Sequence, residues 1–331
     1  MLGRIIVAGI LAAGAPAAAD PALVNLLAPD TKVAAGVDCE AVRASPLGAW
    51  MIERSERHGK ELDEFAAETG FDPRRDLTEI VLGGNGLARD SEGVFAARGR
   101  FDRDALLAYA ERKGVEVTSF GSVPAIVVHR KRPRAVAFPE TDVLVAGKPE
   151  AVAAAAARWE AGAVLAGEIR HEIDRVSAGK HAWFVLLGSP AELLGKLPEA
   201  AEAPGPGTGR LLRAIEAVTA SALFGPQIEM AGEIDTTGAL AAQALAHVIE
   251  FFASVAQLGD SERADLMRRL LDDLDVTVVG DTVLWTLTMA ESDLEELLEK
   301  MPRRRWGRHA HRAAPGSPER SGRPARSGRG R

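Results

Sequence analysis

Cysteine is almost absent from this sequence, since the 331 residues contain only one, Cys39. A single cysteine cannot form a disulfide within the chain, so the fold must be stabilised by burial of apolar side chains. Aromatic residues contribute only 5% of the chain, whereas hydrophobic residues together contribute 47%. This composition predicts a core of small and aliphatic side chains, sufficient for one large domain or two ordinary ones. No histidine lies near Cys39 in the sequence, so a small buried side chain explains this residue as well as a reactive thiol does.

Recognisable catalytic and ligand-binding motifs are missing as well. The histidines form neither a His-Glu-x-x-His motif nor a pairing with cysteine, and no Gly-x-Ser-x-Gly elbow occurs. The glycine-rich loop 83–86 lacks the Lys-Ser/Thr ending and the following helix of a phosphate-binding loop, which favours a hairpin turn. The sequence therefore predicts no catalytic residue, no metal ligand and no bound cofactor, and it favours a non-enzyme over an enzyme.

Acidic residues gather around the last strands that the pattern predicts. The two runs are Asp272, Asp273 and Asp275, and Glu291, Asp293, Glu295 and Glu296. Their spacing fits the approach to a strand and the first turn of a helix, where carboxylates interact favourably with the helix dipole. We expect these side chains to be solvated, rather than to bind a cation or form a catalytic carboxylate pair.

Positive charge is concentrated at the C-terminal end of an otherwise acidic chain. The net charge is −7, but residues 301–331 hold ten Arg against one Glu, so they carry +9 and residues 1–300 carry −16. Such an acidic body is not typical of a nucleic-acid-binding domain. Apart from Trp306, the basic segment is almost entirely Arg, Gly, Pro, Ser, Ala and His, which predicts disorder and electrostatic contact with anionic surfaces. The same composition is also typical of GC-rich coding sequence read out of frame.

The N-terminus has the pattern of an export signal. Arg4 precedes an apolar run at residues 5–13, and Ala15 to Ala19 then offer small residues for signal-peptidase cleavage before Asp20. The apolar run is far shorter than the roughly 20 residues that span a bilayer, and no cysteine stands at the cleavage site to carry a lipid. We therefore predict a signal peptide at residues 1–19 and a periplasmic or secreted protein.

Four structural landmarks occur twice in the same order along the chain. They are a strand before a Ser-Pro helix opening, a hairpin, an apolar-Asp pair before a helix, and a hairpin that runs into a helix. The first set includes Ser45-Pro46, Phe101-Asp102 and residues 134–159, and the second includes Ser189-Pro190, Ile234-Asp235 and residues 276–300. The repetition predicts an α+β fold with an internally duplicated strand-helix-hairpin-helix-hairpin-helix unit and mostly antiparallel sheets.

The predicted organisation is a signal peptide at 1–19, a first α+β repeat at 20–165, a second at 166–300 and a disordered basic tail at 301–331. An export signal followed by such a duplicated unit resembles uncharacterised secreted bacterial proteins classed as domains of unknown function. The resemblance covers about residues 20–300 and rests on organisation rather than on a motif. It brings no active-site residues with it.

The helix expected at residues 239–258 has an unusual distribution of polar residues. They fall four, three, four and three positions apart, which gathers them into one narrow stripe: Gln243, His247, Glu250, Ser254 and Gln257. The remaining circumference is apolar, and we expect it to be buried by the chain's own strands. The alternative is an apolar groove for a ligand or partner around Leu245, His247 and Phe252, in which His247 is a polar handle rather than a catalyst.

These observations favour a non-catalytic extracytoplasmic binding or scaffolding protein. Its partner would be an unknown protein or an apolar small molecule, and no nucleic acid is expected. Two alternatives stay open: an exported hydrolase whose site is assembled from dispersed residues, and a carrier of an apolar ligand.

Overall fold

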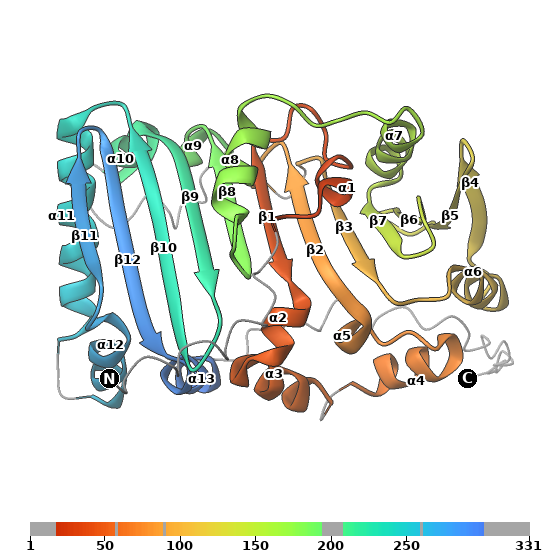
Figure 1. Cartoon of the computed structure of the whole chain (residues 1–331), viewed down its shortest axis with the longest axis horizontal. Coiled ribbons are helices and arrows are strands. Elements are labelled where there is room, and N and C mark those ends of the chain that lie inside the picture. Colours follow the sequence, from red (N-terminus) through yellow and green to blue (C-terminus); the bar gives the residue numbers. More distant parts are fainter. Residues whose placement is uncertain (1–17, 57–58, 89–90, 194–207, 259–260, 301–331) are drawn as a thin grey trace, which may run out of the picture.

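The computed structural model describes residues 18–56, 59–88, 91–193, 208–258 and 261–300. Its strands are β1 (Val33–Asp38), β2 (Leu77–Gly84), β3 (Gly93–Gly99), β4 (Glu116–Phe120), β5 (Val123–Val128), β6 (Arg134–Ala137), β7 (Val143–Gly147), β8 (Ala182–Leu187), β9 (Ile215–Leu223), β10 (Gln227–Thr236), β11 (Asp275–Val279) and β12 (Thr282–Ala290). They form one 12-stranded sheet in the order β11-β12-β10-β9-β8-β1-β2-β3-β7-β6-β5-β4 (Figure 1). All neighbouring strands are antiparallel. The predicted α+β class with antiparallel pairing is therefore confirmed.

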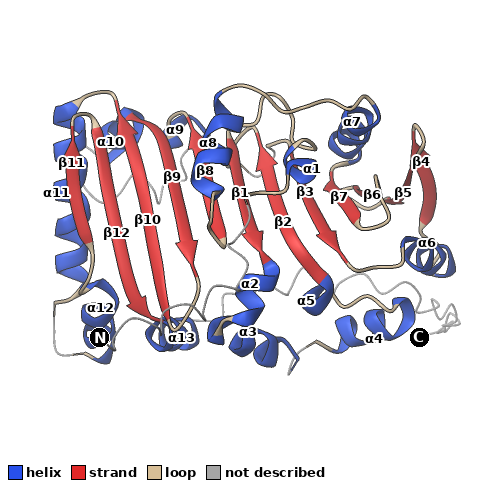
Figure 2. Cartoon of the chain, in the orientation of Figure 1, coloured by secondary structure: helices blue, strands red, loops and turns tan. Residues whose placement is uncertain are grey.

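The helices lie on both faces of this sheet and at the ends of its strands (Figure 2). They are α1 (Pro21–Val24), α2 (Cys39–Ala44), α3 (Pro46–Glu56), α4 (Lys60–Thr69), α5 (Pro73–Asp76), α6 (Arg103–Arg112), α7 (Pro149–Glu160), α8 (Glu168–Ser177), α9 (Pro190–Leu193), α10 (Thr208–Ala214), α11 (Ala239–Ala256), α12 (Glu262–Leu271) and α13 (Glu291–Lys300).

The two halves of the sheet have matching strand orders. From the centre outward, the first half runs β1-β2-β3-β7-β6 and the second runs β8-β9-β10-β12-β11, and β5 and β4 extend only the first. β1 and β8 pair directly, so both halves belong to one continuous sheet. The predicted repeat requires this matching order of strands. An origin by duplication and a division of the chain at residue 165 stay predictions. That division falls in the connection between α7 and α8.

The sheet has a core on each face. Alternation along the strands puts Ala34, Val81, Ala96 and Val145 on one face, where α1, α7 and α8 cover them. The opposite face carries three smaller clusters. One lies under α4 and α6, one under α3, α12 and α13, and one under α11. The second half of the sheet is thus covered mainly on the face opposite to the largest core.

Local signals place several predicted helices correctly. α3 follows Ser45, whose hydroxyl accepts from Gly48 N, and α6 follows Asp102, whose carboxylate accepts from Asp104 N and Ala105 N. α4 ends at Gly70 in the left-handed conformation with φ 74°, as the sequence predicts. By contrast, strand β4 was not predicted, because Glu116–Phe120 is short and mostly polar.

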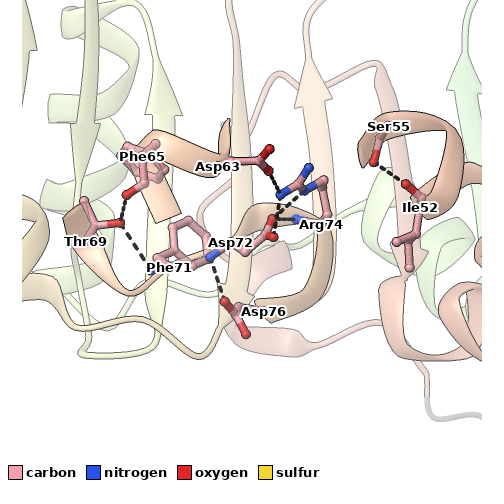
Figure 3. A network of polar contacts seen from close by, with 9 residues as sticks. All are labelled: Ile52, Ser55, Asp63, Phe65, Thr69, Phe71, Asp72, Arg74 and Asp76. Atoms are coloured by element: carbon pink, nitrogen blue, oxygen red, sulfur yellow. Dashed lines mark hydrogen bonds and ion pairs between the residues drawn. The ribbon is translucent and has the colours of Figure 1, made fainter. Parts of the chain in front are cut away.

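A polar network fixes the turn between α4 and α5 (Figure 3). Arg74 bonds to Asp72 through Nε and Nη2 at 2.8 Å each, and Nη2 also lies 2.6 Å from Asp63. Thr69 donates to Phe65 O and accepts from Phe71 N. The network orients the aromatic side chains of Phe65 and Phe71 into the cluster beneath α6.

The second acidic run departs from its predicted solvated environment: Asp293, Glu295 and Glu296 are half-buried, and Glu291 is enclosed. Glu291 is only 3% exposed, and its Oε1 accepts from Leu47 N at the start of α3. The expectation of a solvated carboxylate is wrong for this residue, because α13 packs against α3 and encloses it. The residues of the other run, Asp272, Asp273 and Asp275, are exposed as expected.

Candidate functional site

Helix α11 is the element that departs most from an ordinary packed helix. It lies at one edge of the sheet beside β11, at the end opposite to β4 (Figure 1). Alanine and leucine favour the helical conformation, and no Gly or Pro interrupts the 18 residues. Its composition and length are those of a helix able to cross a membrane, yet only 17% of it is buried.

One stripe of α11 holds the helix on the sheet. Ala242 is fully buried and Ala246 is 4% exposed, and both pack against Val283 on β12. Leu245 and Ile249 are partly buried in the same cluster. Two of these residues are alanines, so the helix axis can approach the strands closely, but little of its circumference is enclosed.

The opposite apolar side of α11 is exposed. The exposed fractions are 83% for Leu240, 61% for Phe251, 47% for Phe252, 43% for Val255 and 72% for Leu258, which follows the helix. The expectation that the chain buries this helix is therefore wrong. A flat sheet can cover only one stripe of a helix, and α10 and α12 are the only other helices that pack closely on α11 within the described residues.

The predicted groove residues do not converge. Leu245 packs toward the sheet, His247 is exposed among the polar residues, and Phe252 is exposed beside Phe251, with ring centroids 5.7 Å apart. The site is thus a convex helix face rather than a groove. We define the α11 apolar face as Leu240, Phe251, Phe252, Val255 and Leu258.

The polar stripe separates the buried stripe from this face on one side of the helix. Gln243, His247, Glu250 and Ser254 are exposed, while Gln257 is partly buried. Ser254 donates to Glu250 O at 2.8 Å within the helix. The stripe contains one acidic residue, Glu250, and one histidine, His247, but no Lys or Arg.

The C-terminal end of the described chain lies near the end of α11. Arg268 on α12 donates to Gln257 O at 2.8 Å, and Lys300 at the end of α13 lies 3.4 Å from Glu262 at the start of α12. Lys300, the last described residue, therefore lies close to the end of α11 that carries Phe251, Val255 and Leu258. The predictions of disorder in this segment and of a signal peptide at 1–19 concern residues outside the described ones, apart from 18 and 19.

Reactive side chains elsewhere offer little chemistry. Burial raises the pKa of Cys39 to about 11, so its thiol is protonated at neutral pH. Ser189 donates to Leu212 O, and Ala191 N in turn donates to Ser189 Oγ, which fits the predicted helix opening. Within the described residues, no group of three or more His, Cys, Asp or Glu side chains could hold a metal ion.

A second apolar feature lies on the sheet itself. A shallow hollow of about 450 Å3 covers parts of β1, β2, β3 and β7, and its floor includes Ala35, Leu82 and Phe95. Leu82 is 46% exposed. Arg134, Lys148 and Glu92 also line it, so an apolar floor occurs together with two cationic side chains and one carboxylate.

The fold and this helix define an α+β protein with a single open sheet and an exposed apolar helix at its edge. No protein-family model matches the sequence, and no curated protein matches it. Among solved structures, the chain is similar to TP0453 in crystal form III, with a TM-score of 0.50 and 12% identity over 84% of this chain and 97% of that chain.

Crystal forms I and IV of TP0453 give TM-scores of 0.49 each. Their identities are 13% and 11%, over 85% and 84% of this chain and 97% and 96% of those chains. At such low identity the likeness concerns the fold alone.

Proposed function

We propose that this protein is a non-catalytic extracytoplasmic binding protein that attaches to an anionic lipid surface through the α11 apolar face. The observation that carries this proposal is the exposure of Leu240, Phe251 and Leu258 on one side of a helix whose other side is fixed to the sheet. Contiguous apolar side chains on a surface mark an interaction site, and each large side chain fully buried contributes about 1.5–3 kcal/mol.

A position in the membrane interface fits α11 better than a position across the bilayer. Its 18 residues would reach about 27 Å, close to the thickness of the hydrocarbon core. Crossing would require Ala242 and Ala246 to leave Val283, and it would place Glu250 among lipid tails. Lying parallel to the surface buries the α11 apolar face and leaves the packed stripe on the sheet.

The charge distribution favours an anionic surface. Residues 1–300 carry −16 and would be repelled by anionic lipids, whereas residues 301–331 carry +9 and follow Lys300, which lies near the end of α11. Each basic residue near such a surface contributes about 1 kcal/mol, and stable attachment generally needs two signals. The apolar face supplies one signal and the basic segment supplies the other.

Carriage of an amphiphile is a second candidate function, supported by the hollow on the sheet. Ala35, Leu82 and Phe95 offer an apolar floor, and Arg134 and Lys148 would suit an anionic head group. The hollow is shallow, so it would leave much of a bound chain in water. The hollow therefore fits a single apolar molecule poorly. The α11 apolar face fits a lipid surface better.

Vesicle sedimentation tests the proposal. We expect residues 20–331 to sediment with vesicles of phosphatidylcholine and phosphatidylglycerol and to bind at least tenfold more weakly to phosphatidylcholine alone. Truncation after Lys300 should weaken binding to the anionic vesicles at least tenfold, because it removes the positive segment, and 0.5 M NaCl should do the same.

The truncated protein also provides the stability control. Its melting temperature should equal that of the longer chain, as expected if the basic segment is dispensable for folding. Equal binding to both vesicle types, or no binding to either, would contradict attachment to an anionic lipid surface. Uptake of a monomeric fluorescent fatty acid without vesicle binding would favour the carrier.

A further inference from the structure

Glu79 on β2 is a partly buried carboxylate, and the guanidinium of Arg98 near it is already paired with Asp20 and Asp142. Glu79 Oε1 accepts a hydrogen bond from the backbone nitrogen of Asp20 at 2.8 Å, although 59 residues separate the two in sequence. Within the described residues Glu79 forms no ion pair. The pKa of Glu79 is raised to about 7, chiefly by burial and also by the carboxylates of Asp20 and Asp38, although the hydrogen bond from Asp20 N and the charge of Arg98 act to lower it.

Negative groups outnumber positive ones around Glu79. Arg98 lies 2.6 Å from Asp20 Oδ2 and 3.7 Å from Glu140, and it also pairs with Asp142. One guanidinium thus serves three carboxylates before Glu79 is considered. A partly buried carboxylate in such surroundings needs another positive charge to remain ionised at neutral pH.

The position of Asp20 can supply that charge. The residues Ala17, Ala18 and Ala19 precede it and match the small-residue pattern that signal peptidases cleave. We propose that Asp20 is the first residue of the exported protein and that its α-ammonium group forms an ion pair with Glu79. This inference rests on the export that belongs to the proposed function, and not on lipid binding.

The step is the hydrolysis of the Ala19–Asp20 peptide bond by a signal peptidase. Water supplies the oxygen of the new Ala19 carboxylate, which leaves with the signal peptide. The nitrogen of Asp20 takes up protons and becomes an ammonium group. The amide N–H that donates to Glu79 in the uncleaved chain is thereby replaced by a charged donor at the same atom.

Asp20 is already held in position for this pairing. Its carboxylate accepts from Ala22 N at 2.8 Å, which caps α1, and it also binds Arg98. The ammonium would therefore face Glu79 with little further ordering of the chain. Cleavage also removes Ala19, which is 7% exposed in the largest core and whose backbone nitrogen donates to Ser177 Oγ at 3.1 Å.

Processing changes the expected dependence of stability on pH. In an uncleaved chain, the pKa of Glu79 is about 7 in the folded state and about 4.3 in the unfolded state, so the folded state binds the proton more tightly. The resulting contribution to folding stability is fully present below pH 4 and is lost as the pH rises through 7. An ammonium partner lowers the pKa of Glu79 and removes this loss. The amino group's own pKa rises above its ordinary value of about 7.7–8.0, so the ion pair is lost only in alkaline solution.

The experiment compares two N-termini on the chain that ends at residue 331. One protein starts at Asp20 with a free amino group, released from a fusion by a protease that leaves no extra residue, and the other carries a Gly-Ser extension. At pH 7.5 we expect the free form to melt at least about 3 °C higher, and at pH 4.5 we expect a smaller difference. Glu79→Gln should abolish the difference, whereas Glu229→Gln, at an exposed position on β10, should preserve it.

Two further measurements do not depend on the stability of the variant. Mass spectrometry of the exported protein should give a chain that begins at Asp20, and acylation of its amino group at pH 7.5 should be at least tenfold slower than in the extended form. A different first residue, equal melting temperatures, or a difference that survives Glu79→Gln would overturn the proposal. Loss of vesicle binding in these proteins would instead concern the α11 apolar face.

Discussion

Phe251→Asp and Val255→Asp should each leave the melting temperature within about 2 °C of the unsubstituted protein and weaken binding to anionic vesicles more than tenfold. Both side chains are exposed on the α11 apolar face, so a charge there remains in water in the free protein. On a lipid surface the same charge would have to enter the apolar layer. Loss of one buried side chain alone removes about 1.5–3 kcal/mol, which corresponds to at least tenfold in affinity.

Leu245→Asp and Gln243→Asp are the matched comparisons on the same helix. Leu245 packs in the cluster under α11, so an unpaired carboxylate there should cost more than about 2 kcal/mol of folding free energy. Gln243 is exposed in the polar stripe, so its substitution should change folding and binding little. Unfolding of Phe251→Asp would show that the protein itself covers this face. Unchanged vesicle binding by both exposed variants would show that lipid does not cover it.

Local sequence patterns predicted most of the elements for physical reasons that do not depend on distant contacts. The helix openings after Ser45 and Asp102, and the end of α4 at Gly70, depend on capping within a few residues. Hairpins such as β9–β10 depend on alternating apolar residues around a short turn. β4 was missed because its residues form a strand only through their pairing with β5.

The sequence predicts the polar stripe of α11 but not the exposure of its apolar side. The period of 3.6 residues correctly gathered Gln243, His247 and Glu250 on one side of α11, but it cannot say how much of the remaining side a sheet will cover. The sheet covers one stripe, and the rest is exposed. The approach of Asp20 to Glu79 depends on packing across 59 residues, and no local pattern signals it.

The continuity of the sheet depends on close contact between β1 and β8, where Gly36 lies opposite Trp183. Trp183 is 5% exposed, and a Cβ atom at position 36 would lie 2.3 Å from its indole ring. A similar arrangement occurs in the second half, where a Cβ at Gly232 would lie 2.5 Å from Thr219 O and 2.6 Å from the indole of Trp285. Neither glycine has a positive φ, so glycine is required for lack of space: beside an indole at position 36, and beside an indole and a backbone carbonyl at position 232.

Gly36→Ala should lower the free energy of unfolding by about 1–3 kcal/mol, because the indole must shift within a packed core. The control is Gly225→Ala, where the nearest atom to a new Cβ is Gln227 O at 3.5 Å and little change is expected. A double-mutant cycle measured by denaturant unfolding tests the cause: in a Trp183→Leu background, Gly36→Ala should cost much less. Because the β1–β8 pair joins the two halves of the sheet, both halves should unfold in one transition. Hydrogen exchange of backbone amides in β2 and in β10 monitors each half. An equal cost in both backgrounds would exclude the contact with Trp183 as the cause, and separate transitions would show that the halves fold independently despite their shared sheet.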